Sequence, residues 1–222
     1  MHSIYGPKIK VLLGGHDRGA RMVHRMALSR SELPGLDVIG LFMADIVPIV
    51  DQFAVFSNPA ASIKYFHWAF LPITNLSVDM IMAYGGGRWC KQILQRSVGS
   101  SEKGRANMFA DDALEVYARD FEKESVNRAA AEDYRSASNE DYKMQVEDQE
   151  KRRQIDLPTL IIFSEKSLGA MHDVPATWKK WFTEGTKYQI EGIGNDVGHY
   201  VCEEAPEESA KMLVDFIEEL GY

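Results

Sequence analysis

The stretch Lys8–Arg21, with the sequence KIKVLLGGHDRGAR, decides the fold of this chain. Its first half is an apolar run that breaks at two glycines, and its second half leads directly into a helical pattern. This order predicts a strand, a tight turn and a helix over residues 18–30. Gly15-His16-Asp17-Arg18-Gly19 follows the nucleophile-elbow pattern, in which a sharp turn lifts one side chain above a sheet. The lifted residue is Asp17, whose carboxylate can attack carbon and form an ester, or can instead cap the helix that follows.

Three further apolar runs predict strands, and they cover residues 38–44, 159–163 and 188–190. Helices are expected over residues 175–183 and 206–220, each with a proline near its first turn. Strands that alternate with helices favour a parallel sheet with helices on both faces. The expected fold class is therefore α/β.

The residues between the second and third strands differ from both flanks. They begin with aromatic clusters and continue as a long charged helical stretch over residues 111–153. Gly85-Gly86-Gly87 follows no strand and precedes no Lys-Ser or Lys-Thr pair, so it indicates a turn rather than a phosphate loop. We therefore expect a core of residues 1–47 and 157–222, with a helical cap formed by residues 48–156.

Composition and charge exclude several other classes of protein. The 222 residues are 45% apolar and 26% charged, which is typical of a globular chain. Twenty-five basic against 33 acidic residues give a net charge of -8, which disfavours nucleic acid as a partner. The two cysteines lie far apart and form neither a disulfide framework nor a zinc signature. With no apolar run of membrane-spanning length, the chain is predicted to be cytoplasmic, without metal, cofactor or membrane contact.

Two residues could complete a catalytic set with Asp17. His199 follows the last predicted strand, and its place after the nucleophile matches the order nucleophile, acid, histidine of α/β hydrolases. The acid that orients the histidine could be Asp45 or Asp173. Asp45 is favoured because it directly follows a strand, where open α/β sheets place their sites. Asp173, two residues before a proline, also suits the role of a turn cap.

Arg18 and Arg21 lie on the first helical turn after Asp17. The N-terminus of a helix already carries positive partial charge, so cations there need an anion nearby. That anion could be Asp17 itself or a substrate carboxylate held by the planar guanidinium groups.

Several longer segments resemble the fluoroacetate dehalogenase branch of the α/β hydrolases. These segments are Gly15–Arg21, His24–Leu28, Asp45–Pro48, Tyr65–Leu71, Glu132–Arg135, Gly198-His199 and Glu203–Pro206. The resemblance implies that Asp17 is the nucleophile, that His199 activates water and that Asp45 orients His199. It also implies a site for the substrate carboxylate at Arg18 and Arg21, and a site for the departing halide at His67, Trp68 and Tyr134. Indole and phenol groups suit that second role because they are preorganised hydrogen-bond donors.

Members of that branch also carry strands and a His-Gly motif before the elbow, which this sequence does not show. We therefore expect a partial α/β-hydrolase fold, with the C-terminal strands of the parallel sheet and the cap. The strand before Asp17 would then be an open edge, and this edge or the aromatic cap could support a homodimer.

The expected function is hydrolysis of the carbon–halogen bond of small 2-haloacids through an aspartyl ester, with a small molecule as the partner. An epoxide hydrolase is the first alternative, in which Tyr65 or Tyr84 acts with Tyr134 to protonate the epoxide oxygen. The second alternative is a catalytically impaired remnant that serves as a binding module.

Overall fold

A computed structural model describes residues 9–221 of the chain. Within these residues one parallel sheet is formed, with the strand order β1-β2-β3-β4. Its strands are β1 (Ile9–His16), β2 (Leu36–Ala44), β3 (Thr159–Ser164) and β4 (Tyr188–Ile193). All strand predictions are confirmed, although Lys8, where the first was expected to begin, lies outside the described residues. Strand β4 runs three residues beyond the prediction because Glu191, Gly192 and Ile193 pair with β3.

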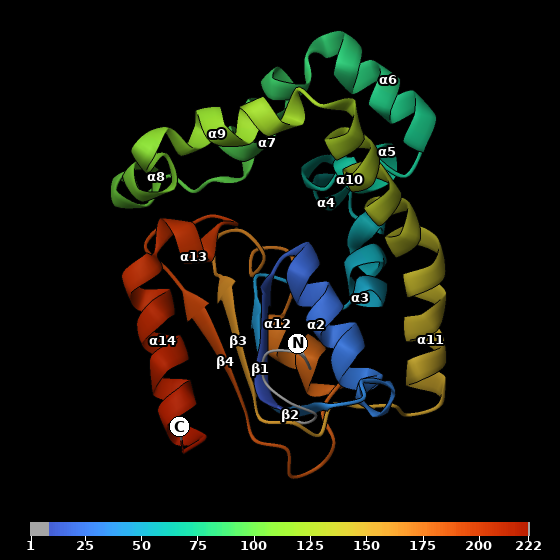
Figure 1. Ribbon diagram of the computed structural model, residues 1–222, viewed down its shortest axis with the longest axis vertical. Helices are drawn as coiled ribbons and strands as arrows, with labels where there is room; N and C mark the ends of the chain where they lie inside the picture. Colours follow the sequence, from blue (N-terminus) through green and yellow to red (C-terminus); the bar gives the residue numbers. More distant parts are fainter. Residues whose placement is uncertain (1–8, 222) are drawn as a thin grey trace.

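Helices cover both faces of the sheet, as Figure 1 shows. The helices on one face are α2 (Arg18–Leu28) and α12 (Val174–Lys179), and those on the other are α13 (Val201–Glu204) and α14 (Pro206–Glu219). Successive residues of a strand point to opposite faces, so Met43 packs with the α2 and α12 side while Phe42 packs with the α14 side. The three-layer α/β class is therefore confirmed.

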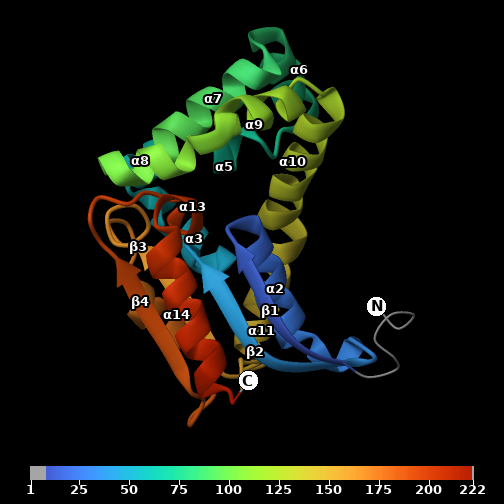
Figure 2. The same ribbon diagram turned by 60° about the vertical axis from the view of Figure 1, so that its left-hand side comes forward.

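Burial differs sharply between the strands. Every residue of β3 is buried, whereas none of β1 is. This difference follows from position, since β1 forms one edge of the sheet within the described residues (Figure 2). A short helical turn over Arg30–Glu32 links α2 to β2.

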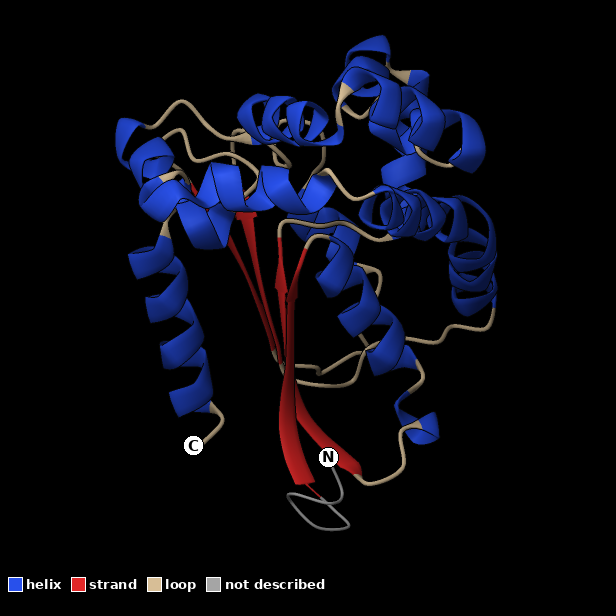
Figure 3. Cartoon of the chain, turned by 45° about the horizontal axis from the view of Figure 1, so that its top comes forward, coloured by secondary structure: helices blue, strands red, loops and turns tan. Residues whose placement is uncertain are grey.

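A run of helices connects β2 to β3, and we call residues 49–150 the helical segment. Its α-helices are α3 (Ile49–Ala54), α4 (Pro59–Lys64), α5 (His67–Phe70), α6 (Thr74–Tyr84), α7 (Gly86–Ser97), α8 (Glu102–Met108), α9 (Ala113–Phe121), α10 (Glu124–Ser136) and α11 (Tyr142–Glu150). Short turns over Val55–Ser57 and Ala110–Asp112 and a π-helical turn over Ala137–Asp141 connect them. Figure 3 shows the segment beyond the arrowheads of the strands, which is where the cap is expected. The division into two domains stays a prediction.

Two helix predictions need correction. The charged stretch 111–153 is not one helix, because Lys123 adopts an extended backbone (φ -84°, ψ 122°) between α9 and α10, and the last helix ends at Glu150. The helix expected over 175–183 ends at Lys179, because the chain must then extend for Phe182 to pair with Ile155 in an isolated bridge.

The three glycines of the helical segment form a turn between two helices, as predicted. Gly85 ends α6 with a φ of 101°, and Gly86 begins α7. A side chain at Gly86 would place its Cβ only 1.9 Å from the carbonyl oxygen of Phe121. Glycine is therefore needed for α7 to pack against α9. No helix in the described range 9–221 is both long and apolar enough to cross a membrane.

Candidate active site

The turn between β1 and α2 has the geometry of an elbow. Asp17 has φ 47° and ψ -119°, and its backbone N–H donates to the carbonyl of Ala44 at 3.1 Å. A Cβ at Gly15 would lie 2.4 Å from the carbonyl carbon of Gly19, so only glycine lets the strand and helix approach this closely. The Asp17 side chain makes no capping hydrogen bond to α2. The capping alternative is therefore wrong, and the carboxylate is free to face the site.

Asp45 and His199 come together at the ends of β2 and β4. The Nδ1 of His199 lies 2.6 Å from Oδ2 of Asp45, and Oδ1 of Asp45 accepts from the backbone N–H of Ser164 at 2.7 Å. Asp173 instead caps α12 by accepting from the N–H of Ala176 at 3.0 Å. Of the two candidate acids, Asp45 is thus the partner of His199, and it is buried.

The second ring nitrogen of His199 faces Asp17, with Nε2 3.6 Å from Oδ2. Burial by itself would lower the pKa of His199, but hydrogen bonding and charge interaction with Asp17 and Asp45 outweigh it and raise the pKa to about 10. Burial acts on Asp17 in the opposite sense, yet His199 and Arg21 hold the pKa of this carboxyl well below its usual range. Without a bound substrate, the protonated His199 and the ionised Asp17 therefore form an ion pair near neutral pH.

Glu204 holds the loop that carries His199, and the sequence did not indicate this role. Its Oε2 accepts from the backbone N–H groups of Gly99 and Gly198, both at 2.8 Å, and its Oε1 accepts from that of Tyr200 at 3.1 Å. The side chain is buried, and it ties the helical segment to the residues on both sides of His199. The only sequence signal was its place in the Glu203–Pro206 motif.

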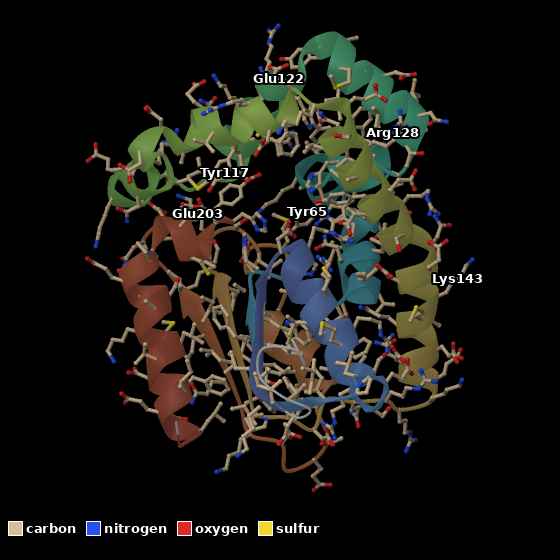
Figure 4. The ribbon with its side chains drawn as sticks, viewed as in Figure 1. Tyr65, Tyr117, Glu122, Arg128, Lys143 and Glu203 are labelled. Atoms are coloured by element: carbon tan, nitrogen blue, oxygen red, sulfur yellow. The ribbon has the colours of Figure 1, made fainter. Side chains whose placement is uncertain are left out.

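Replacing Glu204 with glutamine should displace His199. An amide has one oxygen to accept with, so at least one buried backbone N–H would lose its partner, at a cost of about 1–3 kcal/mol in unfolding free energy. We expect a lower midpoint in urea denaturation and, in the folded variant, a changed pKa of His199 by NMR titration. Glu203→Gln is the matched control, since Glu203 is exposed and accepts from Tyr117 (2.8 Å, Figure 4). A folded Glu204→Gln protein with an unchanged His199 titration would contradict the positioning role.

A cavity of about 680 Å³ opens beside Asp17 and His199. Arg21, His67, Trp68 and Tyr134 also line it. Asp45 is in its lining as well, so the cavity brings together seven of the eight predicted site residues. The exception is Arg18, which is absent from the lining.

The two arginines differ in their partners. Arg18 forms an ion pair with Asp133 through Nε and donates from Nη2 to the carbonyl of the same residue at 3.0 Å. Arg21 forms no salt bridge with residues 9–221, although Asp17 attracts it at longer range. Its Nη1 donates to the carbonyl of Val47 at 2.8 Å, and its guanidinium lies 4.5 Å from the ring centroid of Trp68. Burial lowers the pKa of Arg21 to about 10, so the group keeps its charge at neutral pH. The Nε of Arg21 and Nη1 of Arg18 are both buried without a hydrogen-bond partner among residues 9–221.

His67, Trp68 and Tyr134 form one aromatic cluster. The Tyr134 ring meets those of Trp68 and His67 edge to face, with centroids 5.1 and 5.4 Å away. Burial lowers the pKa of His67 to about 4 and raises that of Tyr134. The imidazole is therefore neutral and the phenol protonated near pH 7, so both can donate a hydrogen bond.

Two more polar side chains reach the cavity. Tyr65 and Gln52 line it, and their side chains interact with each other, which offsets part of the rise that burial causes in the pKa of Tyr65. Figure 4 shows Tyr65 on the side of the helical segment that faces the sheet. Tyr84, the alternative to Tyr65 as an acid, is 39% exposed and is not part of the lining. Gln52 carried no sequence signal. Across residues 9–221, no three His, Cys, Asp or Glu side chains are grouped to hold a metal ion.

The sequence was compared with protein-family models and with known proteins. No family model matches the chain. A fluoroacetate dehalogenase from a Burkholderia species is 26% identical over 211 residues, which cover 92% of this chain and 62% of that protein. The chain thus spans less than two thirds of the curated relative it matches.

Several solved structures of hydrolases are also similar to this chain. A candidate α/β hydrolase from Nostoc sp. PCC 7120 is 29% identical, with a TM-score of 0.80 over 95% of this chain and 66% of that one. A variant of a candidate epoxide hydrolase from Pseudomonas aeruginosa is 26% identical, with a TM-score of 0.82 over 99% and 69%. An epoxide hydrolase named CorEH, 18% identical with a TM-score of 0.78, shares the fold. The chain therefore has part of the α/β-hydrolase fold, and its resemblance to the fluoroacetate dehalogenase branch is confirmed.

Proposed function

We propose that this chain carries the active site of a hydrolytic dehalogenase for small 2-haloacids. The observation that supports the mechanism is the position of Asp17 on the elbow, 3.6 Å from His199, whose other nitrogen is held by Asp45. A nucleophile, a base and an orienting acid in this arrangement suit a reaction in two steps.

In the first step a carboxylate oxygen of Asp17 attacks the carbon that bears the halogen. The new C–O bond forms as the C–X bond breaks, and the halide leaves with the bonding electron pair. Trp68 and Tyr134 face the cavity as donors that can stabilise this developing charge. Arg21 would hold the carboxylate of the substrate, because its buried Nε has no hydrogen-bond partner in the part of the chain that the structure describes.

In the second step water cleaves the ester. His199 takes a proton from water at Nε2, and the hydroxide attacks the carbonyl carbon of the Asp17 ester. The ester C–O bond then breaks, and the oxygen of the leaving group takes the proton from His199, which releases the 2-hydroxyacid. Asp17 passes its new proton to His199 and is a carboxylate again. The imidazolium formed on His199 is stabilised by Asp45 at 2.6 Å. Halide release from a haloacetate, measured with the purified chain, tests the whole proposal.

Replacing Arg21 with lysine should weaken the use of haloacids. An ammonium group cannot supply the planar fork that binds a carboxylate through two nitrogens, so we expect kcat/KM for bromoacetate to fall about 10- to 100-fold. The uncharged bromoacetamide should react equally with both proteins. Arg25→Lys is the matched control, because Arg25 lies one turn further along α2 and pairs with Asp148 at 2.7 Å. Equal losses on the acid and its amide would refute a carboxylate site at Arg21.

Epoxide hydrolysis is the second candidate function. It is favoured by one observation, namely that Tyr65 and Tyr134 both line the cavity and burial raises the pKa of each phenol. Two protonated phenols could donate to an epoxide oxygen while Asp17 attacks carbon. Turnover of styrene oxide with no halide release from bromoacetate would favour this function over the first.

A further inference from the structure

The charge of the cavity is opposite to that of the chain. Its lining includes the cationic side chains Arg21, Lys64, Arg96, Arg105 and Lys166, and the carboxylates Asp17 and Asp45. The whole chain, in contrast, has 33 acidic and 25 basic residues. Both carboxylates face His199, so the remaining lining is positive and attracts anions.

Lys64 and Arg96 are lining cations that form no ion pair with any carboxylate of residues 9–221. Lys64 Nζ donates to the carbonyl of Ser167 at 2.5 Å, and Arg96 Nη2 donates to the carbonyl of Ile63. A backbone carbonyl carries no net charge, so neither cation is neutralised by a direct carboxylate partner, and Lys64 has only a longer-range attraction to Asp45. Lys166 is different, because its Nζ lies 2.5 Å from Asp196.

Arg96 reaches the end of the helix that carries Lys64, although the two cations come from different helices. Lys64 ends α4 and Arg96 lies near the end of α7. Arg96 bonds to the carbonyl of Ile63, the residue directly before Lys64, and its guanidinium lies 4.9 Å from the ring centroid of Phe66. Burial lowers the pKa of Lys64, which means that its ammonium group is incompletely solvated and would gain from an anion.

The size of the cavity leaves room for more than a haloacetate. Cavities of about 300–1,000 Å³ accommodate drug-sized ligands, and this one measures about 680 Å³. An acid of two carbons bound between Asp17 and Arg21 would fill only a small part of it. A longer substrate could reach from Arg21 to Lys64 and Arg96.

We propose that Lys64 and Arg96 form a second anion subsite in the cavity, so that the preferred substrates carry a further anionic group besides the carboxylate at Arg21. The placement of the first carboxylate rests on the proposed function. The second subsite itself rests on these two cations, which form no ion pair within residues 9–221, and it can be tested by binding alone.

The test compares inert acids of equal length by isothermal titration calorimetry. Succinate, glutarate and adipate are measured against butanoate, pentanoate and hexanoate, with 3-phosphonopropanoate as an arm that distinguishes a phosphonate from a carboxylate. A charged hydrogen bond predicts that at least one dianion binds about tenfold or more tightly than its monoanion. Equal affinities at every length would overturn the subsite.

Variants then locate the preference. Lys64→Met and Arg96→Met should each reduce the advantage of the dianion and together remove it, while binding of the monoanions stays unchanged. Lys166→Met is the control, because this lining cation is already matched by Asp196. A preference that survives the double variant would contradict the assignment. If a variant does not fold, the salt dependence in the unmodified chain still decides, since the preference for dianions must fall with ionic strength.

Turnover separates this inference from the proposed function. The 2-bromo derivatives of the same acids are assayed for bromide release. Preferential binding of dianions without bromide release would support the subsite and contradict the dehalogenase. Bromide release with no preference for dianions would support the dehalogenase and contradict the subsite.

Discussion

Replacing His199 with alanine should stop the reaction at the aspartyl ester. Without the base, water cannot be activated to attack the ester, whereas Asp17 can still displace the halide. Incubation with bromoacetate should therefore add the mass of one carboxymethyl group to the intact protein, and digestion should place it on Asp17. Removal of a general base typically costs a factor of about 10²–10⁴, so steady bromide release should fall by at least that amount.

The control for this experiment is the double variant Asp17→Asn and His199→Ala. Asn and Asp are the non-glycine residues that most readily adopt positive φ, so the elbow should persist when Asp17, with its φ of 47°, becomes asparagine. This protein should gain no mass at position 17. Folded His199→Ala protein that binds bromoacetate but forms no adduct on Asp17 would contradict the covalent mechanism; alkylation of the free thiols Cys90 and Cys202 would occur equally in both variants and is subtracted.

Local sequence patterns predicted the elbow and the sheet because both depend on short-range rules. Two glycines around Asp17 allow the backbones of β1 and α2 to approach, and the structure shows this contact at Gly15 and Gly19. Asp45 could be predicted because parallel strands end at the same edge, which brings the residue after β2 beside the loop after β4. The alternative, Asp173, proved to be a helix cap for equally local reasons.

Contacts between distant parts of the chain could not be predicted in this way. Arg18 pairs with Asp133 of α10, a contact set by how the helical segment lies over the sheet. The role of Glu204 depends on Gly99, which approaches from the helical segment so closely that a Cβ there would lie 1.9 Å from the carbonyl oxygen of Asp196. Neither arrangement has a signature in residue spacing, because each depends on packing between elements far apart in sequence.

Replacing Asp17 with asparagine should lower the pKa of His199. In the native protein this pKa is raised to about 10 by two carboxylates that outweigh burial, and one of them is Asp17. An opposite charge at this separation typically contributes about 1–3 units, so we expect a fall of that size in an NMR titration of the imidazole. Esterification of Asp17 removes the same charge. The ester would therefore convert His199 from an imidazolium into a base at the step that needs one.

The raised pKa of His199 also makes the unfolding free energy of the protein fall as the pH rises. The pKa of His199 is higher in the folded protein than its ordinary value of 6.5, so its contribution is complete below pH 6.5 and is lost as the pH rises toward 10. Native stability should therefore decrease over this range, by up to about 1.4 kcal/mol per pH unit, and the decrease should end at a lower pH in Asp17→Asn. Urea denaturation between pH 5.5 and 9.5 measures both curves. Asp173→Asn is the control, because Asp173 caps α12, whereas the carboxylates that face His199 are Asp17 and Asp45. If the unfolding free energies of Asp17→Asn and the native chain fall over the same pH range, Asp17 does not raise the pKa of His199. Esterification of Asp17 could then not convert His199 into a base.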